Sequence, residues 1–318
     1  MSYCTDVKED ILKLNTDASS HLVELEACLR LGSEVVISNP MRLIYSSTNM
    51  HVMRYFIGLV KKLYSNISYQ LESIQLQKLK RQTIYSCVIS DGSKTIISDL
   101  GLLEPISIRK DEILDSDVFI KAYLRGAFLT KGSVNDPKTS NYHLEICTTK
   151  ELEALFLQRA LNYFDLNARI AKRRSNLIVY LKEKDKIVDC LRYIGANVTM
   201  NEFENMIIKR DLSAHINRQM NIDVANQQKT NKSAKEQIKY IRYLETYYPI
   251  EKLDKKLLIV MEARKKNPEA SLSELISILN CDYEDNITKS GLNHRLRRIK
   301  EIALDFESRR RDKNENRN

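Results

Sequence analysis

The chain has 318 residues, of which 43% are hydrophobic, and it contains 8 Gly and 5 Pro. These values fit a folded protein of two or three domains and exclude a collagen-like or low-complexity chain. No segment reaches the roughly 18 to 20 consecutive apolar residues of a membrane-spanning helix, and the polar N-terminus lacks a signal-peptide core. We therefore expect a soluble protein of the cytoplasm that does not contact a membrane.

The formal net charge of +9 is unevenly distributed. Residues 205–318 hold 24 Lys and Arg against 17 Asp and Glu, whereas residues 1–204 hold 27 against 25. A basic excess in one part of a chain is typical of a surface that binds a polyanion. The last third is therefore the candidate nucleic-acid binder.

The cysteines are far apart and form no C-x-x-C pair, which favours reduced core thiols over a disulfide framework or a zinc site. His143 and Cys147 could share a strand face, but no third ligand lies nearby in the sequence. We expect no metal and no cofactor. The six cysteines are Cys4, Cys28, Cys87, Cys147, Cys190 and Cys281.

Two segments of like design follow each other, one near residues 17–103 and one near 117–196. Each opens with an apolar helix that ends in Gly-Ser, continues with a short hairpin marked by a Pro turn, and then has an amphipathic helix. Two further β-prone runs and a short helix close each segment. The predicted class is α+β, with one antiparallel sheet per half and helices on its inner face.

The pattern places these elements at definite residues. In the first half we predict a strand at 42–47, a helix at about 49–64 and strands at 67–74 and 83–90. In the second half the corresponding elements are a strand at 142–148, a helix at about 150–164, and strands at 167–172 and 176–183.

Small residues near the ends of the two opening helices would allow their backbones to approach closely. They are Ala27, Cys28 and Gly32 in the first helix and Gly126, Ala127 and Gly132 in the second. The alternative is an ordinary duplicated α+β domain without a central helix pair.

The segment that follows residue 215 is polar. Residues 216–235 are rich in Asn, Gln and Lys and are predicted to form a linker between a domain at 1–215 and a second domain at 236–306. Asn226 and Lys229 in this linker suit phosphate contacts, although an exposed linker explains them nearly as well. The basic tail 307–318 is predicted to be disordered and to add salt-sensitive affinity for DNA.

The second domain has the pattern of a helix-turn-helix. Ser271 and Glu274 form a capping box before a helix that runs to about residue 279, and Thr288 can cap the next helix. An earlier amphipathic helix ends at Pro268 and completes the three-helix support. The apolar residues of the last helix, at three- and four-residue spacing, are Leu292, Leu296, Ile299 and Ala303.

The opposite face of this last helix carries side chains that suit DNA. Asn can pair with adenine and Arg with guanine, while Lys and the amides of the first turn can hold phosphate. The usual alternative is that such a face is simply solvated. The predicted DNA-binding residues are Thr288, Lys289, Ser290, Asn293, His294, Arg297 and Arg298.

The segment LRGAFLTKG (124–132) resembles the motif that names the LAGLIDADG homing endonucleases, and ELEACLRLG (24–32) is a weaker match at the corresponding place. The paired αββαββα halves are similar to the single-chain architecture of that family. In those enzymes the acidic residue before the last Gly binds the catalytic metals. Here the two positions are Leu31 and Lys131, which cannot bind Mg²⁺, so we expect no metal-dependent hydrolysis.

The same resemblance implies a second DNA surface, because nucleases of this shape bind DNA on their sheets. The residues that could supply phosphate contacts there are Arg169, Lys172, Arg173 and Arg174. The alternative role for this domain is contact with a protein partner.

The whole chain more specifically resembles the WhiA family of bacterial DNA-binding regulators, which join a degenerate LAGLIDADG domain to a helix-turn-helix. The segments that carry the likeness include YLRGAFLTKGSVNDP (123–137), VYLKEKDKIVDCLRYIGA (179–196), NRQMNIDVANQQKT (217–230) and TKSGLNHRLRRIKEIA (288–303). The resemblance implies a role in transcription connected with cell division and chromosome segregation, and with sporulation in spore-forming relatives.

Three functions fit these observations to different degrees. A sequence-specific DNA-binding regulator, which is not an enzyme and acts at the nucleoid, explains the charge asymmetry, the helix-turn-helix and the missing acids together. Its expected partners are double-stranded DNA and, as a second class, another transcription regulator or RNA polymerase. The alternatives are a metal-dependent homing-type endonuclease and a scaffolding protein that binds DNA incidentally.

Overall fold

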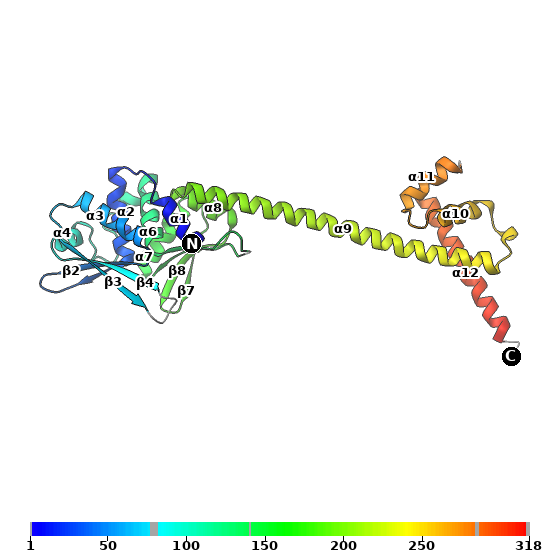
Figure 1. Cartoon of the computed structure of the whole chain (residues 1–318), viewed down its shortest axis with the longest axis horizontal. Coiled ribbons are helices and arrows are strands. Elements are labelled where there is room, and N and C mark those ends of the chain that lie inside the picture. Colours follow the sequence, from blue (N-terminus) through cyan, green and yellow to red (C-terminus); the bar gives the residue numbers. More distant parts are fainter. Residues whose placement is uncertain (1, 77–81, 140, 284–285, 316–318) are drawn as a thin grey trace. The chain divides into compact units, whose positions relative to one another are not determined.

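The computed structural model describes residues 2–76, 82–139, 141–283 and 286–315, and it divides into two compact units, Met1–Asp211 and Leu212–Asn318. The first unit is α+β and the second is helical (Figure 1). Among the described residues, no helix is both long and apolar enough to cross a bilayer.

The first half of the first unit follows the short helix α1 (Tyr3–Ile11) and forms a four-stranded antiparallel sheet in the order β1-β2-β4-β3. Its helices are α2 (Ala18–Gly32), α3 (Met50–Leu63) and α4 (Ser93–Asp99). Its strands are β1 (Ser33–Val36), β2 (Arg42–Ser47), β3 (Tyr69–Leu76) and β4 (Gln82–Ile89).

The second half repeats this arrangement in the order β5-β6-β8-β7. Its helices are α5 (Lys110–Leu114), α6 (Asp117–Lys131), α7 (Glu151–Asn162) and α8 (Lys184–Tyr193). Its strands are β5 (Gly132–Val134), β6 (Leu144–Thr148), β7 (Arg169–Arg173) and β8 (Asn176–Leu181). The duplicated α+β fold is therefore confirmed.

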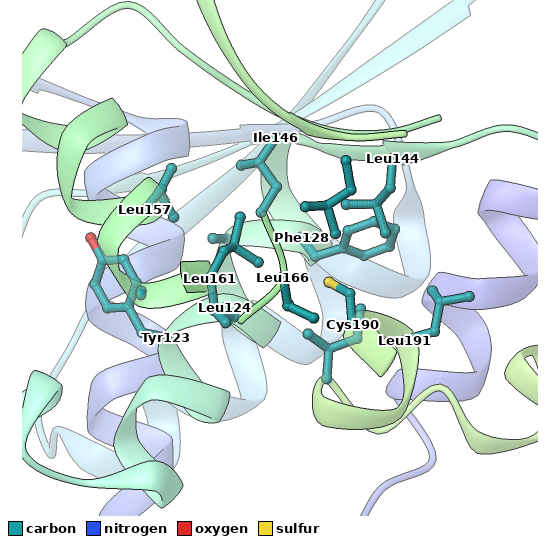
Figure 2. Packing of buried hydrophobic residues seen from close by; sticks show 14 of the residues in the cluster. Tyr123, Leu124, Phe128, Leu144, Ile146, Leu157, Leu161, Leu166, Cys190 and Leu191 are labelled. Carbon is teal, nitrogen blue, oxygen red and sulfur yellow. The ribbon is translucent and has the colours of Figure 1, made fainter. Parts of the chain in front are cut away.

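Alternation along the strands decides which face of each sheet is covered, because successive side chains point to opposite faces. Leu43 and Tyr45 of β2 are fully buried under α2 and α3, and Leu144 and Ile146 of β6 are buried under α6 and α7. Figure 2 shows the second of these cores, where Phe128 of α6 and Leu161 of α7 pack toward the strand residues. In the described part of the first unit, no helix covers the other face of either sheet (Figure 1).

The helices α2 and α6 pack against each other at the centre of the unit. A Cβ atom on Gly126 would lie 2.4 Å from the Glu24 carbonyl oxygen and 3.0 Å from the Ala27 Cβ, and a Cβ on Gly32 would lie 2.5 Å from Thr130 Cγ2. The close approach predicted at these glycines is confirmed. Gly132 is different, because a Cβ there would meet its own helix at Phe128, so this glycine serves the strand entry and not the helix pair.

Buried polar contacts join the two halves across this helix pair. The carboxylate of Glu24 accepts hydrogen bonds from Arg125 and from Tyr55, and the Glu24 and Arg125 side chains are almost completely buried. A buried ion pair that loses one partner is costly, so the Glu24–Arg125 pair fixes the register of the two halves. Arg30 instead anchors the end of the first half: it pairs with Glu26 of its own helix at 3.0 Å and donates to the carbonyls of Gly101 and Ile106.

The helix α9 (Asn197–Tyr247) begins in the first unit, where the Asp10 carboxylate accepts from the amides of Val198 and Thr199 at 2.8 and 2.9 Å. It continues without a break through residues 216–235, so the segment predicted as a linker is helical. The segment contains neither Pro nor Gly, and Asn, Gln and Lys are compatible with an exposed helix.

The second unit contains the end of α9, the short 3₁₀ helix η1 (Ile250–Lys252), α10 (Lys255–Lys266), α11 (Leu272–Asp282) and α12 (Lys289–Glu315). Ile241 and Leu244 of α9 are buried in one core with Leu257, Leu275 and Leu292 from the three following helices. Because α12 runs to Glu315, the prediction of a disordered tail is wrong for residues 307–315. Residues 316–318 of that tail lie outside the described residues.

Candidate nucleic-acid interface

The helix-turn-helix is formed by α11 and α12. Ser271 Oγ accepts from the Glu274 amide at 3.2 Å, and the Glu274 carboxylate accepts from the Ser271 amide at 2.6 Å, which confirms the capping box. These hydrogen bonds hold the pKa of Glu274 below its ordinary value. Leu275 and Leu279 then bury the inner face of α11.

The turn between the two helices is closed by a residue that sequence reasoning missed. The Asn280 side chain accepts from the Ile287 amide at 2.6 Å and donates to the Ile287 carbonyl at 3.4 Å. Thr288 Oγ1 then accepts from the Gly291 amide at 3.2 Å, as its predicted role as a cap requires. Asn280 therefore sets the point at which α12 begins.

Arg264 holds the preceding connection, between α10 and α11. Its side chain is buried, and it donates to the carbonyl of Ala270 at 2.6 Å and to that of Asn267 at 3.5 Å. Burial lowers the pKa of Arg264 to about 10, so it stays charged at neutral pH. This arginine is structural, and its basic side chain is not available to DNA.

The apolar residues predicted for α12 are all buried, namely Leu292, Leu296, Ile299 and Ala303. The opposite face is exposed. All seven predicted DNA-binding residues are exposed: Thr288, Lys289, Ser290, Asn293, His294, Arg297 and Arg298. Among them, Arg298 has an acidic neighbour, Glu301, at 3.3 Å.

Asn293 and Arg297 lie in a groove between α12 and the end of α9. Ser233, Glu236 and Gln237 of α9 form its other wall, and the side-chain oxygen Oε1 of Gln237 is buried without a hydrogen-bond partner among the described residues. The groove thus combines donors and acceptors beside the two side chains best suited to read base edges.

In the first unit, the structure separates the four basic residues predicted on the sheet. Arg169 pairs with Tyr180 and Arg173 with Asn176, so both arginines lie on the uncovered face of the second sheet. Lys172 alternates to the other face, and Arg174 lies in the turn with a φ of +58°.

Neighbours on the same uncovered face are polar and aromatic. Arg173 lies 3.9 Å from Glu145, whose carboxylate also contacts His143 at 2.9 Å. The His143 ring stacks on Tyr180, with 5.6 Å between ring centroids, and the ammonium of Lys182 lies 5.2 Å from the Tyr180 centroid. The positive charge of this face therefore comes mainly from Arg169, Lys182 and the partly neutralised Arg173.

The positions that carry acids in the homing endonucleases hold no carboxylate. Leu31 packs against the apolar core, and Lys131 is exposed in the last turn of α6. Within residues 2–76, 82–139, 141–283 and 286–315, no three His, Cys, Asp or Glu side chains are grouped as a metal site would need.

The two residues predicted in the linker lie on a helix. Asn226 lines a pocket with three acidic side chains, Asp223, Glu269 and Glu274, and this surrounding does not favour a phosphate. Lys229 is exposed.

A duplicated LAGLIDADG-like unit without its metal-binding acids, followed by a helix-turn-helix, defines a class of DNA-associated proteins. Family models match every part of this arrangement: the WhiA N-terminal LAGLIDADG-like domain over residues 18–103, the WhiA LAGLIDADG-like domain over 120–213, and the WhiA C-terminal HTH domain over 216–303. The chain belongs to the WhiA family.

Relatives along the whole length agree. The chain is 38% identical to a probable cell division protein WhiA of Ligilactobacillus salivarius over 95% of this chain and 96% of that one. It is 36% identical to the protein of the same name from Staphylococcus carnosus, over 95% and 96%. The crystal structure of full-length DUF199/WhiA from Thermatoga maritima matches with a TM-score of 0.59 and 25% identity, over 96% and 98% of the two chains.

Proposed function

We propose that the protein is a sequence-specific DNA-binding transcription regulator that acts in cell division and chromosome segregation and has no nuclease activity. The observation that carries this proposal is the capped helix-turn-helix whose second helix exposes Asn293 and Arg297 opposite a buried apolar face. Relatives named as cell division proteins supply the process, and duplex DNA as partner would place the protein at the nucleoid.

In this mechanism α12 enters the major groove with its first turns. Asn293 would pair with adenine and Arg297 with guanine, since each presents two hydrogen-bonding atoms at the required spacing. Ser290, His294 and Arg298 would contact neighbouring base edges. Lys289 and the hydroxyl of Thr288 at the start of α12 would hold a phosphate.

The first unit would serve as a second surface. Arg169 and Arg173 are suited to phosphate contacts on the uncovered sheet, and Lys172 and Arg174 at its edge could extend them. Lys229 of α9 is a further candidate, whereas the acidic surroundings of Asn226 make it the weakest. Another transcription regulator or RNA polymerase would bind the surfaces of the first unit that DNA leaves free.

The protein is not expected to hydrolyse DNA. Mg²⁺ is bound by carboxylates and water, and at the ends of α2 and α6 the chain offers Leu31 and Lys131 instead. Incubation of the purified protein with plasmid DNA and Mg²⁺ or Mn²⁺ is expected to leave the DNA intact. Cleavage that a chelator stops would contradict this part of the proposal.

The test of sequence reading uses a site selected from random duplexes by the purified protein. The double variant Asn293→Ala, Arg297→Ala is expected to lose roughly 30-fold or more of its preference for that site over a scrambled duplex, because each two-bond base contact contributes about 1–3 kcal/mol of discrimination. The measurement is a binding titration with both duplexes at one salt concentration.

The matched control is Ser308→Ala, Arg309→Ala. It removes a polar side chain, here a hydroxyl, and a guanidinium from the exposed surface of α12, but farther along the helix. It should keep the full preference. If the first double variant also keeps it, α12 does not read the bases.

A further inference from the structure

A slowly winding row of exposed side chains, polar or basic except for Ala225, runs along α9 within the second unit. Its members recur at steps of three and four residues, which place them on one face of a helix. We call it the α9 basic row; it consists of Arg218, Asn221, Ala225, Gln228, Lys232, Lys235, Lys239 and Arg242, and every member is exposed.

The row contains five cations and no acid. Within the described residues, none of the five forms an ion pair with an acidic side chain. Of the acids in this part of α9, Glu245 binds Lys265 at 2.7 Å, whereas Asp223 lines the pocket beside Asn226 and Glu236 lines the groove beside Asn293. A helix face that is merely solvated usually alternates its charges at four-residue spacing. Among these five cations only Lys232 has an acid at that spacing, Glu236, and the two form no ion pair within the described residues.

The other side of the same helix holds the row in place. Ala234 is buried, and Ile241 and Leu244 lie in the core of the second unit together with residues of α10, α11 and α12. Since rotation of α9 would expose these residues, the basic row is fixed toward solvent. It also belongs to the same compact unit as Asn293 and Arg297.

We infer that the α9 basic row is a second binding surface for the phosphate backbone of duplex DNA. From Arg218 to Arg242 the row is about 36 Å long at 1.5 Å per residue, close to one turn of B-form DNA. Arg, Lys, Asn and Gln are the side chains that contact phosphates without reading sequence. The inference rests on the proposed function, because it adds a backbone grip to the base reading of α12.

The α9 basic row also shows why the linker prediction named Asn226 and Lys229 as the phosphate-binding residues. In a loop, Asn226 and Lys229 would be equivalent to their neighbours. On a helix, Asn226 lies on the side of the acidic pocket, whereas Lys229, four residues after Ala225 and three before Lys232, borders the row on the same helix face.

The test compares two triple variants that remove the same charge. The row variant is Lys232→Gln, Lys235→Gln, Lys239→Gln, in which glutamine keeps the helix propensity. The control is Lys62→Gln, Lys94→Gln, Lys110→Gln, three exposed lysines on helices of the first unit. Circular dichroism and thermal melting establish that both variants fold like the parent.

The readout is the slope of log affinity against log salt concentration, measured with a scrambled duplex and with the selected site. Each lost phosphate contact lowers the magnitude of that slope by about 0.9, so the row variant should lose about 2 to 3 units and bind at least tenfold more weakly at 0.1 M salt. Its ratio of specific to scrambled affinity should be unchanged. The control should keep the parent slope.

The outcomes separate the two proposals. If the parent shows no site preference, the proposed function fails, while the scrambled duplex still reports on the row. If the row variant and the control have equal slopes, the row does not bind DNA. If the row variant keeps its DNA slope but loses binding to phosphatidylglycerol vesicles, the surface is for an anionic membrane and the inference is overturned.

Discussion

The two halves of the first unit share one fold but differ in the charge of their uncovered sheet faces. On the first sheet the register places Glu34, Arg42 and Glu72 on that face, with Ile44 and Ile74 between them. On the second sheet the corresponding face carries Arg169, Arg173 and Lys182, with Glu145 as its acid. Duplication therefore fixed the backbone, while the charge of each exposed face changed independently.

This difference has a consequence for DNA binding. A duplex is uniformly negative, so a surface that grips it along its length needs cations on both sheets. Among the described residues, the uncovered face of the first sheet has more acids than bases, and that of the second has a basic excess. If the first unit contacts DNA, we expect it to do so mainly through its second half.

The largest expected effect tests whether the halves form one body. Gly126→Ala should destabilise the first unit by about 3 kcal/mol or more, because the new Cβ would lie 2.4 Å from the Glu24 carbonyl oxygen and would force α2 and α6 apart. Thermal or urea unfolding of the whole chain measures this cost as the decrease in the free energy of unfolding for the transition of the first unit.

Gly58→Ala is the control for that substitution. Gly58 is also a helical glycine, but a Cβ there would meet no atom within 4 Å. We expect the change to be neutral or stabilising by up to about 1 kcal/mol, since Ala favours helix over Gly. Equal effects at the two glycines would show that the helix pair is not held at the spacing of the structure.

A smaller effect compares the sheets directly. Arg169→Gln and Arg42→Gln each remove one exposed guanidinium from an uncovered sheet face, one in each half. Arg169→Gln should reduce the salt slope of DNA binding by about 0.9, whereas Arg42→Gln should leave it unchanged. Losses of the same size would mean that both halves contact DNA and that the charge difference does not matter.

The repeat itself could be predicted from particular residues. The strand at 42–47 matches β2 residue for residue, because its β-prone run follows a turn marked by Pro40, and Gly126 marked the helix contact. The pairing of Arg30 with the carbonyls of Gly101 and Ile106 could not be predicted, since its partners lie more than 70 residues away and are backbone atoms.

The candidate DNA-binding site likewise has features that the sequence predicts and features that it does not. The apolar spacing of α12 identified which side chains face solvent, so the exposed set that begins at Thr288 followed from the sequence. The role of Asn280 in closing the turn depends on a contact with Ile287 that no local pattern announces. The α9 basic row was hidden because its alignment appears only when residues 216–235 are helical.

The smallest expected effect lies where the two halves meet. Lys131 is exposed in the last turn of α6, and its charge is attracted by the partial negative charge of that helix end. Lys131→Ala should therefore change DNA affinity by less than about twofold, the range expected for a charge that is partly balanced by a helix terminus. The same titration that compares Arg169 and Arg42 measures it.

This result matters more than its size suggests, because Lys131 is near the junction of the sheets. A duplex that crossed both halves would have to pass this junction, and the loss of a cation there would then cost as much as the loss of Arg169. A loss of tenfold or more would thus show that DNA spans the junction despite the acids of the first sheet. A loss below twofold, together with a clear effect of Arg169→Gln, would confine the contact to the second half.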